Sequence, residues 1–263
     1  MLGLVEKGIA APMGTSAFAA EWSWSSNSAT RVSPTRDDEA PKGQERKEQA
    51  RKPPGSATTC DDLDVLVDRK HSLPSEYVPS DLVPLQDYRV PTLGSEVLRL
   101  RREAAEHLRH LMEDAAADGE ELVVASAYRS YEEQQLSHER LISVFGADAD
   151  GMSAQPGHSQ HQLGTAIDFT NAAAGYLVWR PFAQTSAYWW LEHHAWEYGF
   201  VVAYPRGKEE QTGYHWEPWH YRYLGVEEAK RLEEGNLSLQ VFLEREVAMT
   251  HCLDSRRRID GGV

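Results

Sequence analysis

Hydrophobic positions recur with regular periods from about residue 60 onward. In segment 62–70 apolar and polar positions alternate, which predicts a short strand. The three prolines of segment 72–85 predict an extended loop after it. Apolar residues at helical spacing then follow Ser95 and stop at Gly119, so we expect a helix with Ser95 at its N-terminus and Gly119 at its end.

The second half of the chain mixes the same two periods. Ser130 and Glu133 have the spacing of a capping box and predict a helix that reaches about Val144. Thr185 or Ser186 begins another helix, which Gly199 ends. Short apolar runs predict strands at 121–126, 165–169, 200–204 and 219–224, and amphipathic runs predict closing helices at 226–235 and 238–246. Because helices and strands do not follow a βαβ rhythm, we expect an α+β fold, a small and mostly antiparallel sheet flanked by helices.

Residues 1–59 differ in composition from the rest. After Ala20 they are rich in Ser, Thr, Pro, Lys and Glu, which predicts a disordered tail or linker. The first twenty residues are mildly apolar and end in small residues, as a weak export signal does, although a misassigned start or an ordinary tail explains them equally. We therefore expect one domain at 60–252, followed by a flexible tail at 253–263.

Charge and cysteine content narrow the possible partners. The 263-residue chain has a formal net charge of −14, and an acidic protein is poorly suited to bind nucleic acid or an anionic membrane surface. No apolar run reaches eighteen residues, so we expect no transmembrane segment, and we expect a monomer. Cys60 and Cys252 form no CxxC motif, which excludes a thiolate zinc site. They either form a disulfide, which requires an oxidising compartment, or remain two buried thiols.

Two clusters carry residues suited to metal chemistry, GHSQHQLGTAIDF at 157–169 and YHWEPWHYRYLG at 214–225. A catalytic zinc ion usually takes three protein ligands from His and carboxylate side chains, and leaves a fourth position for water. The first cluster offers His161 and Asp168, and the second offers His220. Spacing alone makes this set a modest prediction, because such pairs are common.

The second cluster also contains an acid, Glu217, three residues before His220. Pro218 disfavours a helix between them, so the helical HExxH arrangement does not apply. Positions three apart on a strand face opposite sides. Glu217 must therefore lie on a turn before a strand that carries His220, if both side chains are to reach one metal.

The clusters resemble the motifs of a known family. The first matches the SxHxxGxAxD motif of the LAS metallopeptidases, and the second matches their ExxH motif. The flanking segments resemble VanY-type D-alanyl-D-alanine carboxypeptidases, and the resemblance covers about residues 62–245. These segments are LVDRKHSLPSEYVPSDLV (66–83), SAYRSYEEQ (126–134), YGFVVAYPRGKEEQTGY (198–214) and EPWHYRYLG (217–225).

The resemblance implies a LAS/hedgehog-like zinc peptidase fold and a role for each matching residue. Glu217 would act as general base toward the attacking water and then as general acid toward the leaving amine. Arg129 would stabilise the developing oxyanion. His161, Asp168 and His220 would bind Zn²⁺, and Gln134, Ser159 and Tyr204 would contact the peptide and its terminal carboxylate. His158 either orients one of the ligands or is an ordinary loop histidine.

The implied activity is removal of the terminal D-Ala from peptidoglycan stem peptides or their precursors, outside the cytoplasm, in the cell envelope or after secretion. Within the family, an L,D-carboxypeptidase, a D-Ala-D-Ala dipeptidase or a peptidoglycan endopeptidase are alternatives. A non-catalytic cell-wall binding module that keeps zinc only for structure is an alternative of another class. A fourth protein ligand on the metal would favour that module.

Overall fold

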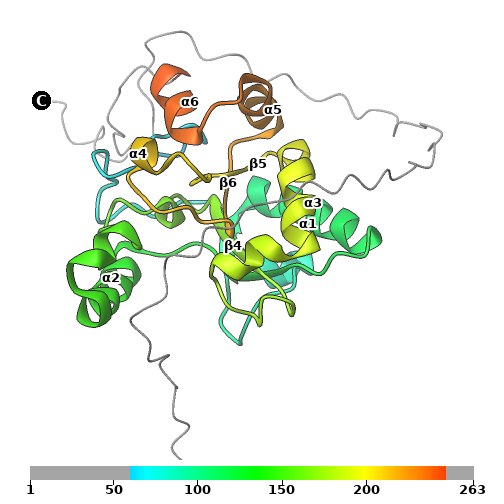
Figure 1. Cartoon of the computed structure of the whole chain (residues 1–263), viewed down its shortest axis with the longest axis horizontal. Coiled ribbons are helices and arrows are strands. Elements are labelled where there is room, and N and C mark those ends of the chain that lie inside the picture. The colour runs from blue at the N-terminus through cyan, green and yellow to red at the C-terminus, as the bar shows by residue number, and fades with distance from the viewer. Residues whose placement is uncertain (1–59, 247–263) are drawn as a thin grey trace, which may run out of the picture. The chain divides into compact units, whose positions relative to one another are not determined.

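The computed structural model describes residues 60–246, and Figure 1 shows how the elements are arranged. The tails predicted at 1–59 and 253–263, and Cys252, lie outside the described residues. The helices are α1 (Arg102–Ala117), α2 (Tyr131–Phe145), α3 (Ser186–His194), α4 (Glu209–Thr212), α5 (Val226–Gly235) and α6 (Leu239–Glu246). The strands are β1 (Leu82–Pro84), β2 (Arg99–Arg101), β3 (Val123–Ser126), β4 (Ala166–Thr170), β5 (Phe200–Val202) and β6 (His220–Tyr223).

The main sheet has four strands in the order β3-β4-β6-β5, and every neighbouring pair is antiparallel. A separate antiparallel ribbon joins β1 to β2. Strands β4, β5 and β6 lie in the middle of the view in Figure 1, with α1 and α3 to one side and α5 and α6 near β5. The predicted α+β fold with a small antiparallel sheet is confirmed.

The two faces of the central strands have different chemistry. Side chains alternate across a strand, and one face of β4 and β6 carries Ile167, Phe169, Tyr221 and Tyr223. These four side chains are almost fully buried and belong to the core cluster that contains the apolar face of α1. The opposite face of the same strands carries Asp168 and His220. The polar site and the apolar core therefore lie on opposite faces of β4 and β6.

The strand predicted at 62–70 is wrong. The segment is buried at Val65 and Val67 but forms no strand. Its carbonyl oxygens at Leu63 and Val65 instead accept hydrogen bonds from Nη2 of Arg222, at 2.9 and 2.6 Å. Because a buried guanidinium takes the place of a neighbouring strand, alternation alone gave the wrong element.

The first helix begins later than predicted, at Arg102 and not at Ser95. Residues Arg99–Arg101 instead form a strand that pairs with Leu82–Pro84. The partner strand Leu82–Pro84 lies inside segment 72–85, which was expected to be a loop. The predicted apolar face is otherwise correct, since the side chains that point to the core are buried. They are Ala104, Ala105, Leu108, Leu111, Met112 and Ala115.

The predicted helix starts at Ser130 and Thr185 are confirmed. The Ser130 hydroxyl accepts from the Glu133 amide at 3.2 Å, and the Glu133 carboxylate accepts from the Ser130 amide at 2.8 Å. Thr185 accepts from the amide of Tyr188 at the start of α3.

Cys60 is buried and disulfide-bonded. Within residues 60–246 no helix is long and apolar enough to cross a membrane.

Candidate metal centre

The register between β4 and β6 brings two of the predicted ligands together. Asp168 and His220 are directly opposite each other across this strand pair, although 52 positions separate them in the sequence. Opposed residues on one face of an antiparallel pair have neighbouring side chains. Nδ1 of His220 lies 2.9 Å from Oδ1 of Asp168.

The third predicted ligand, His161, comes from a short 3-10 turn, η3 (Gln160–Leu163), that leads into β4. Gly164 ends this turn with a positive φ of 67°, and a Cβ at Gly164 would lie 2.8 Å from Cδ2 of Leu82. Glycine therefore permits both the left-handed backbone and the close packing. Nε2 of His161 lies 3.3 Å from Oδ2 of Asp168.

Three ligand atoms, one from each of these residues, lie within 4.8 Å of one another, and the three residues are buried. The ring nitrogens that face away from the cluster are already hydrogen-bonded. Nδ1–H of His161 donates to the carbonyl of Ala127 at 2.7 Å, and Nε2–H of His220 donates to Oε1 of Gln160 at 3.2 Å. These bonds leave the lone pairs of His161 Nε2 and His220 Nδ1 directed at the cluster, which is the arrangement that a metal ion requires.

The protonation states also suit a cation. Burial alone would raise the pKa of Asp168, but His161 and His220 hold that pKa well below its usual range. Burial lowers the pKa of His220, although Asp168 opposes the shift. An ionised carboxylate beside a neutral imidazole is the form in which these groups bind metal. Two His and one Asp, with no fourth His, Cys, Asp or Glu joining the group among residues 60–246, fit a catalytic zinc site.

Glu217 meets the geometric demand set by its spacing from His220. Its carbonyl accepts from the amide of His220 at 3.2 Å, so residues 217–220 form a β-turn with Pro218 at its second position. The turn ends where β6 begins, which places Glu217 before the strand and His220 on it. Burial raises the pKa of Glu217 well above its usual value, the negative charge of Asp168 raises it further, and Arg129 lowers it in part.

Arg129 lies beside this acid on the segment between β3 and α2. Its Nη1 donates to Oε1 of Gln134 at 2.8 Å, its Nη2 donates to Oγ of Ser126 at 2.9 Å, and its amide donates to the carbonyl of His161 at 3.3 Å. Each Nη atom has a second proton. The guanidinium is therefore fixed in place and still has donors for a reacting group.

The three side chains predicted to contact substrate have clear structural partners. Gln134 is almost fully buried, and its Nε2 donates to Ser153 Oγ and to the carbonyl of Ala154. Ser159 Oγ accepts from the amide of His161 at 3.3 Å. Tyr204 stacks on the ring of His220, with centroids 5.0 Å apart. Ser159 and Tyr204 thus contact predicted ligands and Gln134 contacts Arg129, and the contact of all three with a peptide stays a prediction.

Gln160 was not singled out from the sequence, and His158 is not one of the clustered side chains. Nδ1–H of His158 donates to the carbonyl of Asp68 at 2.7 Å, so His158 joins its loop to segment 62–70. The only sequence signal for Gln160 was its position beside His161.

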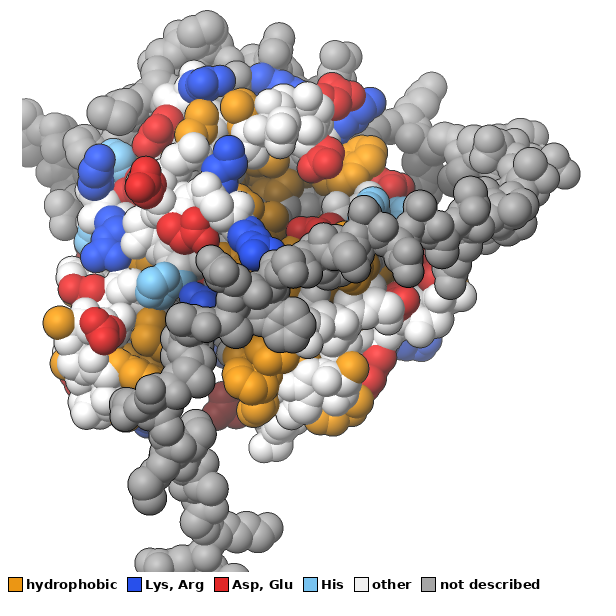
Figure 2. Space-filling model, viewed as in Figure 1, with side chains coloured by type: hydrophobic (Ala, Val, Ile, Leu, Met, Phe, Trp, Pro, Cys, Tyr) orange, Lys and Arg blue, Asp and Glu red, His pale blue; other side chains and the backbone are white. Residues whose placement is uncertain are grey.

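On the face shown in Figure 2, acidic and basic side chains are interspersed, and the surface is hollowed near the middle, where acidic and hydrophobic side chains are visible.

Comparisons with known proteins agree with this geometry. Residues 97–226 match the family model VanY, described as D-alanyl-D-alanine carboxypeptidase. YodJ of Bacillus subtilis (strain 168) is 36% identical over 182 residues, which cover 68% of this chain. The match spans 66% of the length of YodJ.

Two solved structures are similar over most of their own length. The LdcB LD-carboxypeptidase is 35% identical with a TM-score of 0.65, and the match covers 70% of this chain and 87% of that chain. A mutant of the vancomycin resistance D,D-pentapeptidase VanY in complex with Zn(II) is 30% identical with a TM-score of 0.58, and the match covers 69% of this chain and 99% of that chain.

Proposed function

The chain belongs to the VanY family of D-alanyl-D-alanine carboxypeptidases, and from this we propose that it is a zinc-dependent D,D-carboxypeptidase that removes the terminal D-Ala from peptidoglycan stem peptides. The observation that carries the proposal is the set of three converging ligand atoms beside Glu217, an acid of raised pKa. The site of action would lie outside the cytoplasm, in the cell envelope or after secretion. A buried, disulfide-bonded Cys60 is consistent with that location.

His161, Asp168 and His220 would hold the zinc ion. When bound, zinc acts as a Lewis acid that polarises a carbonyl and makes water easier to deprotonate. Glu217 would take a proton from the attacking water, and its electrostatic interaction with Asp168 supports this role because it indicates that the two carboxyl groups are close together. A general base works best when its pKa is close to the working pH, and burial moves the pKa of Glu217 in that direction.

Arg129 would donate hydrogen bonds to the oxygen of the scissile carbonyl as negative charge develops there. Gln134 and Ser126 fix its guanidinium in advance, so little reorganisation is needed during the reaction. Glu217 would then return its proton to the nitrogen of the departing D-Ala, which leaves as the free amino acid. Glu217 thus accepts one proton and returns one, and no covalent acyl-enzyme forms.

The test is a product assay on the zinc-loaded protein with a pentapeptide stem, a tetrapeptide stem and free D-Ala-D-Ala. Mass spectrometry should detect D-Ala and a tetrapeptide from the pentapeptide, at a kcat/KM at least tenfold above that for the other two substrates. Faster cleavage of the tetrapeptide would make the protein an L,D-carboxypeptidase, and faster cleavage of D-Ala-D-Ala would make it a dipeptidase. If none of the three substrates is cleaved, the catalytic proposal is refuted and the wall-binding module is favoured.

A further inference from the structure

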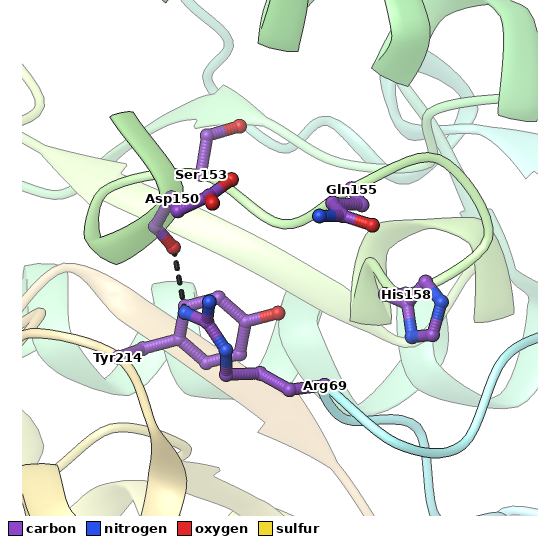
Figure 3. Close-up of a pocket in the computed structure, with 6 residues that line it drawn as sticks. All are labelled: Arg69, Asp150, Ser153, Gln155, His158 and Tyr214. Atoms are coloured by element: carbon purple, nitrogen blue, oxygen red, sulfur yellow. Dashed lines mark hydrogen bonds between the residues drawn. The ribbon is translucent and has the colours of Figure 1, made fainter. Parts of the chain in front are cut away.

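Figure 3 shows a small polar pocket and the side chains that line it. It has a cavity of about 70 Å³, and it is lined by Arg69, Asp150, Ser153, Gln155, His158 and Tyr214. Two contacts join it to the catalytic site. The ring of Tyr214 lies 5.0 Å from that of Tyr204, which stacks on His220, and Ser153 accepts a hydrogen bond from Gln134, the partner of Arg129.

Arg69 is held in this pocket from several sides. Its Nη1 donates to the carbonyl oxygens of Asp150 and Gly213, at 2.7 and 3.0 Å, and its guanidinium lies over the ring of Tyr214 at 5.4 Å. Gly213 has a positive φ of 74°, and a Cβ there would lie 2.4 Å from Cδ of Arg69. The backbone is therefore shaped around this side chain, which is fixed in advance despite its exposure.

Within residues 60–246 Arg69 forms no ion pair, although the acidic Asp150 also lines the pocket. Asp150 offers its backbone carbonyl, while its carboxylate lies 3.6 Å from Nε2 of His138. Among residues 60–246 Arg69 has no carboxylate partner, and its Nε and Nη2 atoms have no hydrogen-bond acceptor within that range. The remaining lining side chains are Ser153, Gln155, His158 and Tyr214, none of which has a carboxylate. A guanidinium with one free edge presents two parallel N–H donors, the arrangement that binds a carboxylate.

We propose that this pocket binds a carboxylate of the peptide substrate, with Nε and Nη2 of Arg69 as the donors. The inference rests on the proposed function, because it takes the ligand to be a peptide. The cavity has room for a carboxylate group. A stem peptide offers a carboxylate from two sources, its C-terminus or an acidic side chain upstream of the cleaved bond.

The alternative is that Arg69 only ties its own segment to the two segments that it touches, at Asp150 and at Gly213 and Tyr214. The two roles differ in what they predict for substrate choice. A purely structural Arg69 would affect all peptides equally, whereas a carboxylate-binding Arg69 would matter only for peptides that carry the recognised carboxylate. Ratios between matched peptides therefore separate the roles, even if a variant is somewhat less stable.

The experiment compares the zinc-loaded wild-type protein with Arg69→Gln and with Lys70→Gln. Lys70 is the matched control, because it is the adjacent exposed cation and does not line the pocket. Each protein is assayed on three peptides that end in D-Ala-D-Ala. One has a free C-terminus and an acidic upstream residue, the second has a C-terminal amide, and the third has a neutral upstream residue.

We expect wild type and Lys70→Gln to prefer one charged peptide over its neutral counterpart, and Arg69→Gln to lose about tenfold of that preference through KM, with kcat little changed. If Arg69→Gln loses the preference for the free C-terminus over the C-terminal amide, the pocket binds the terminal carboxylate. If it loses the preference for the acidic over the neutral upstream residue, the pocket binds the upstream side chain. Either result supports the proposal. It is overturned if Arg69→Gln keeps both ratios, whatever its absolute activity.

A binding measurement separates failure of this inference from failure of the proposed function. In a Glu217→Gln background the peptides stay intact and their dissociation constants can be measured by calorimetry. If wild type releases no D-Ala, the proposed function fails, yet the pocket is still tested. About tenfold weaker binding of the charged peptide after Arg69→Gln supports the pocket, and unchanged binding overturns it.

Discussion

Replacing Gln160 by Ala should weaken metal binding while leaving the metal-free protein nearly as stable as wild type. The reason lies in the two nitrogens of His220. Metal binding requires the lone pair of Nδ1 to face the cluster, which places the ring proton on Nε2, where Gln160 accepts it at 3.2 Å. Without Gln160 that buried N–H has no acceptor, a loss that costs about 1–3 kcal/mol.

The metal-free variant can avoid this cost. Its His220 can carry the proton on Nδ1 instead and donate it to Oδ1 of Asp168, which lies 2.9 Å away. The penalty therefore applies only to the metal-bound state. Loss of a hydrogen bond that orients a metal-bound histidine typically reduces affinity by about 10- to 100-fold, which agrees with the cost of the unsatisfied donor.

The assay is competition for Zn²⁺ between the protein and a fluorescent chelator, together with the melting temperature of the metal-free form. Gln162→Ala is the matched control, because Gln162 lies in the same turn and is also buried, but its amide donates to the carbonyl oxygens of Pro74 and Tyr77. Gln162→Ala should lower stability and keep zinc affinity. An unchanged dissociation constant in Gln160→Ala, or equal weakening in both variants, would refute this reasoning.

The other predictions concern the acid, the metal and one helix end. Glu217→Gln should keep zinc, measured by metal analysis, and lower kcat by about 10²- to 10⁴-fold, and near-normal turnover would refute the assigned role. Because the pKa of Glu217 is raised in the folded protein, the metal-free wild type should lose stability as pH rises above the ordinary value of 4.5, and Glu217→Gln should show a higher melting temperature at pH 7 to 8. Chelation of zinc should abolish D-Ala release and a β-lactam should not, so inhibition by the β-lactam would indicate a different mechanism. Ser130→Ala should cost about 1 kcal/mol by removing the cap of α2, seen as a melting temperature roughly 2–4 °C lower, while the exposed Gln135→Ala should change it less.

Sequence periodicity predicted those elements whose stability is local. The capping pair Ser130–Glu133 and the apolar face of α1 depend on residues a few positions apart, and both were predicted correctly. Segment 62–70 was misread because its partner, Arg222, lies 159 positions from Leu63. The start of α1 was misplaced for a similar reason, since Arg99–Arg101 extend only because Leu82–Pro84 pair with them.

The candidate site divides in the same way. The clustering of His161, Asp168 and His220 followed from matched motifs and not from spacing, because the strand register that joins Asp168 to His220 is a long-range property. The same limit applies to Gln160 and Arg69. Each contacts partners that only the fold brings near, and neither has a local pattern that distinguishes it from an ordinary polar residue.

The β-turn at Glu217 explains why an acid and a ligand three residues apart can serve one site. A helix would place both on one face, but the ring of Pro218 disfavours it, and a continuous strand would point them to opposite sides. In the turn the amide of His220 donates a hydrogen bond to the carbonyl of Glu217, so that β6 begins at the predicted ligand itself. The strand that fixes His220 against Asp168 therefore also fixes the position of Glu217. A change that shifts the register of β6 should impair metal binding and proton transfer together, whereas a change of the Glu217 side chain should impair only proton transfer.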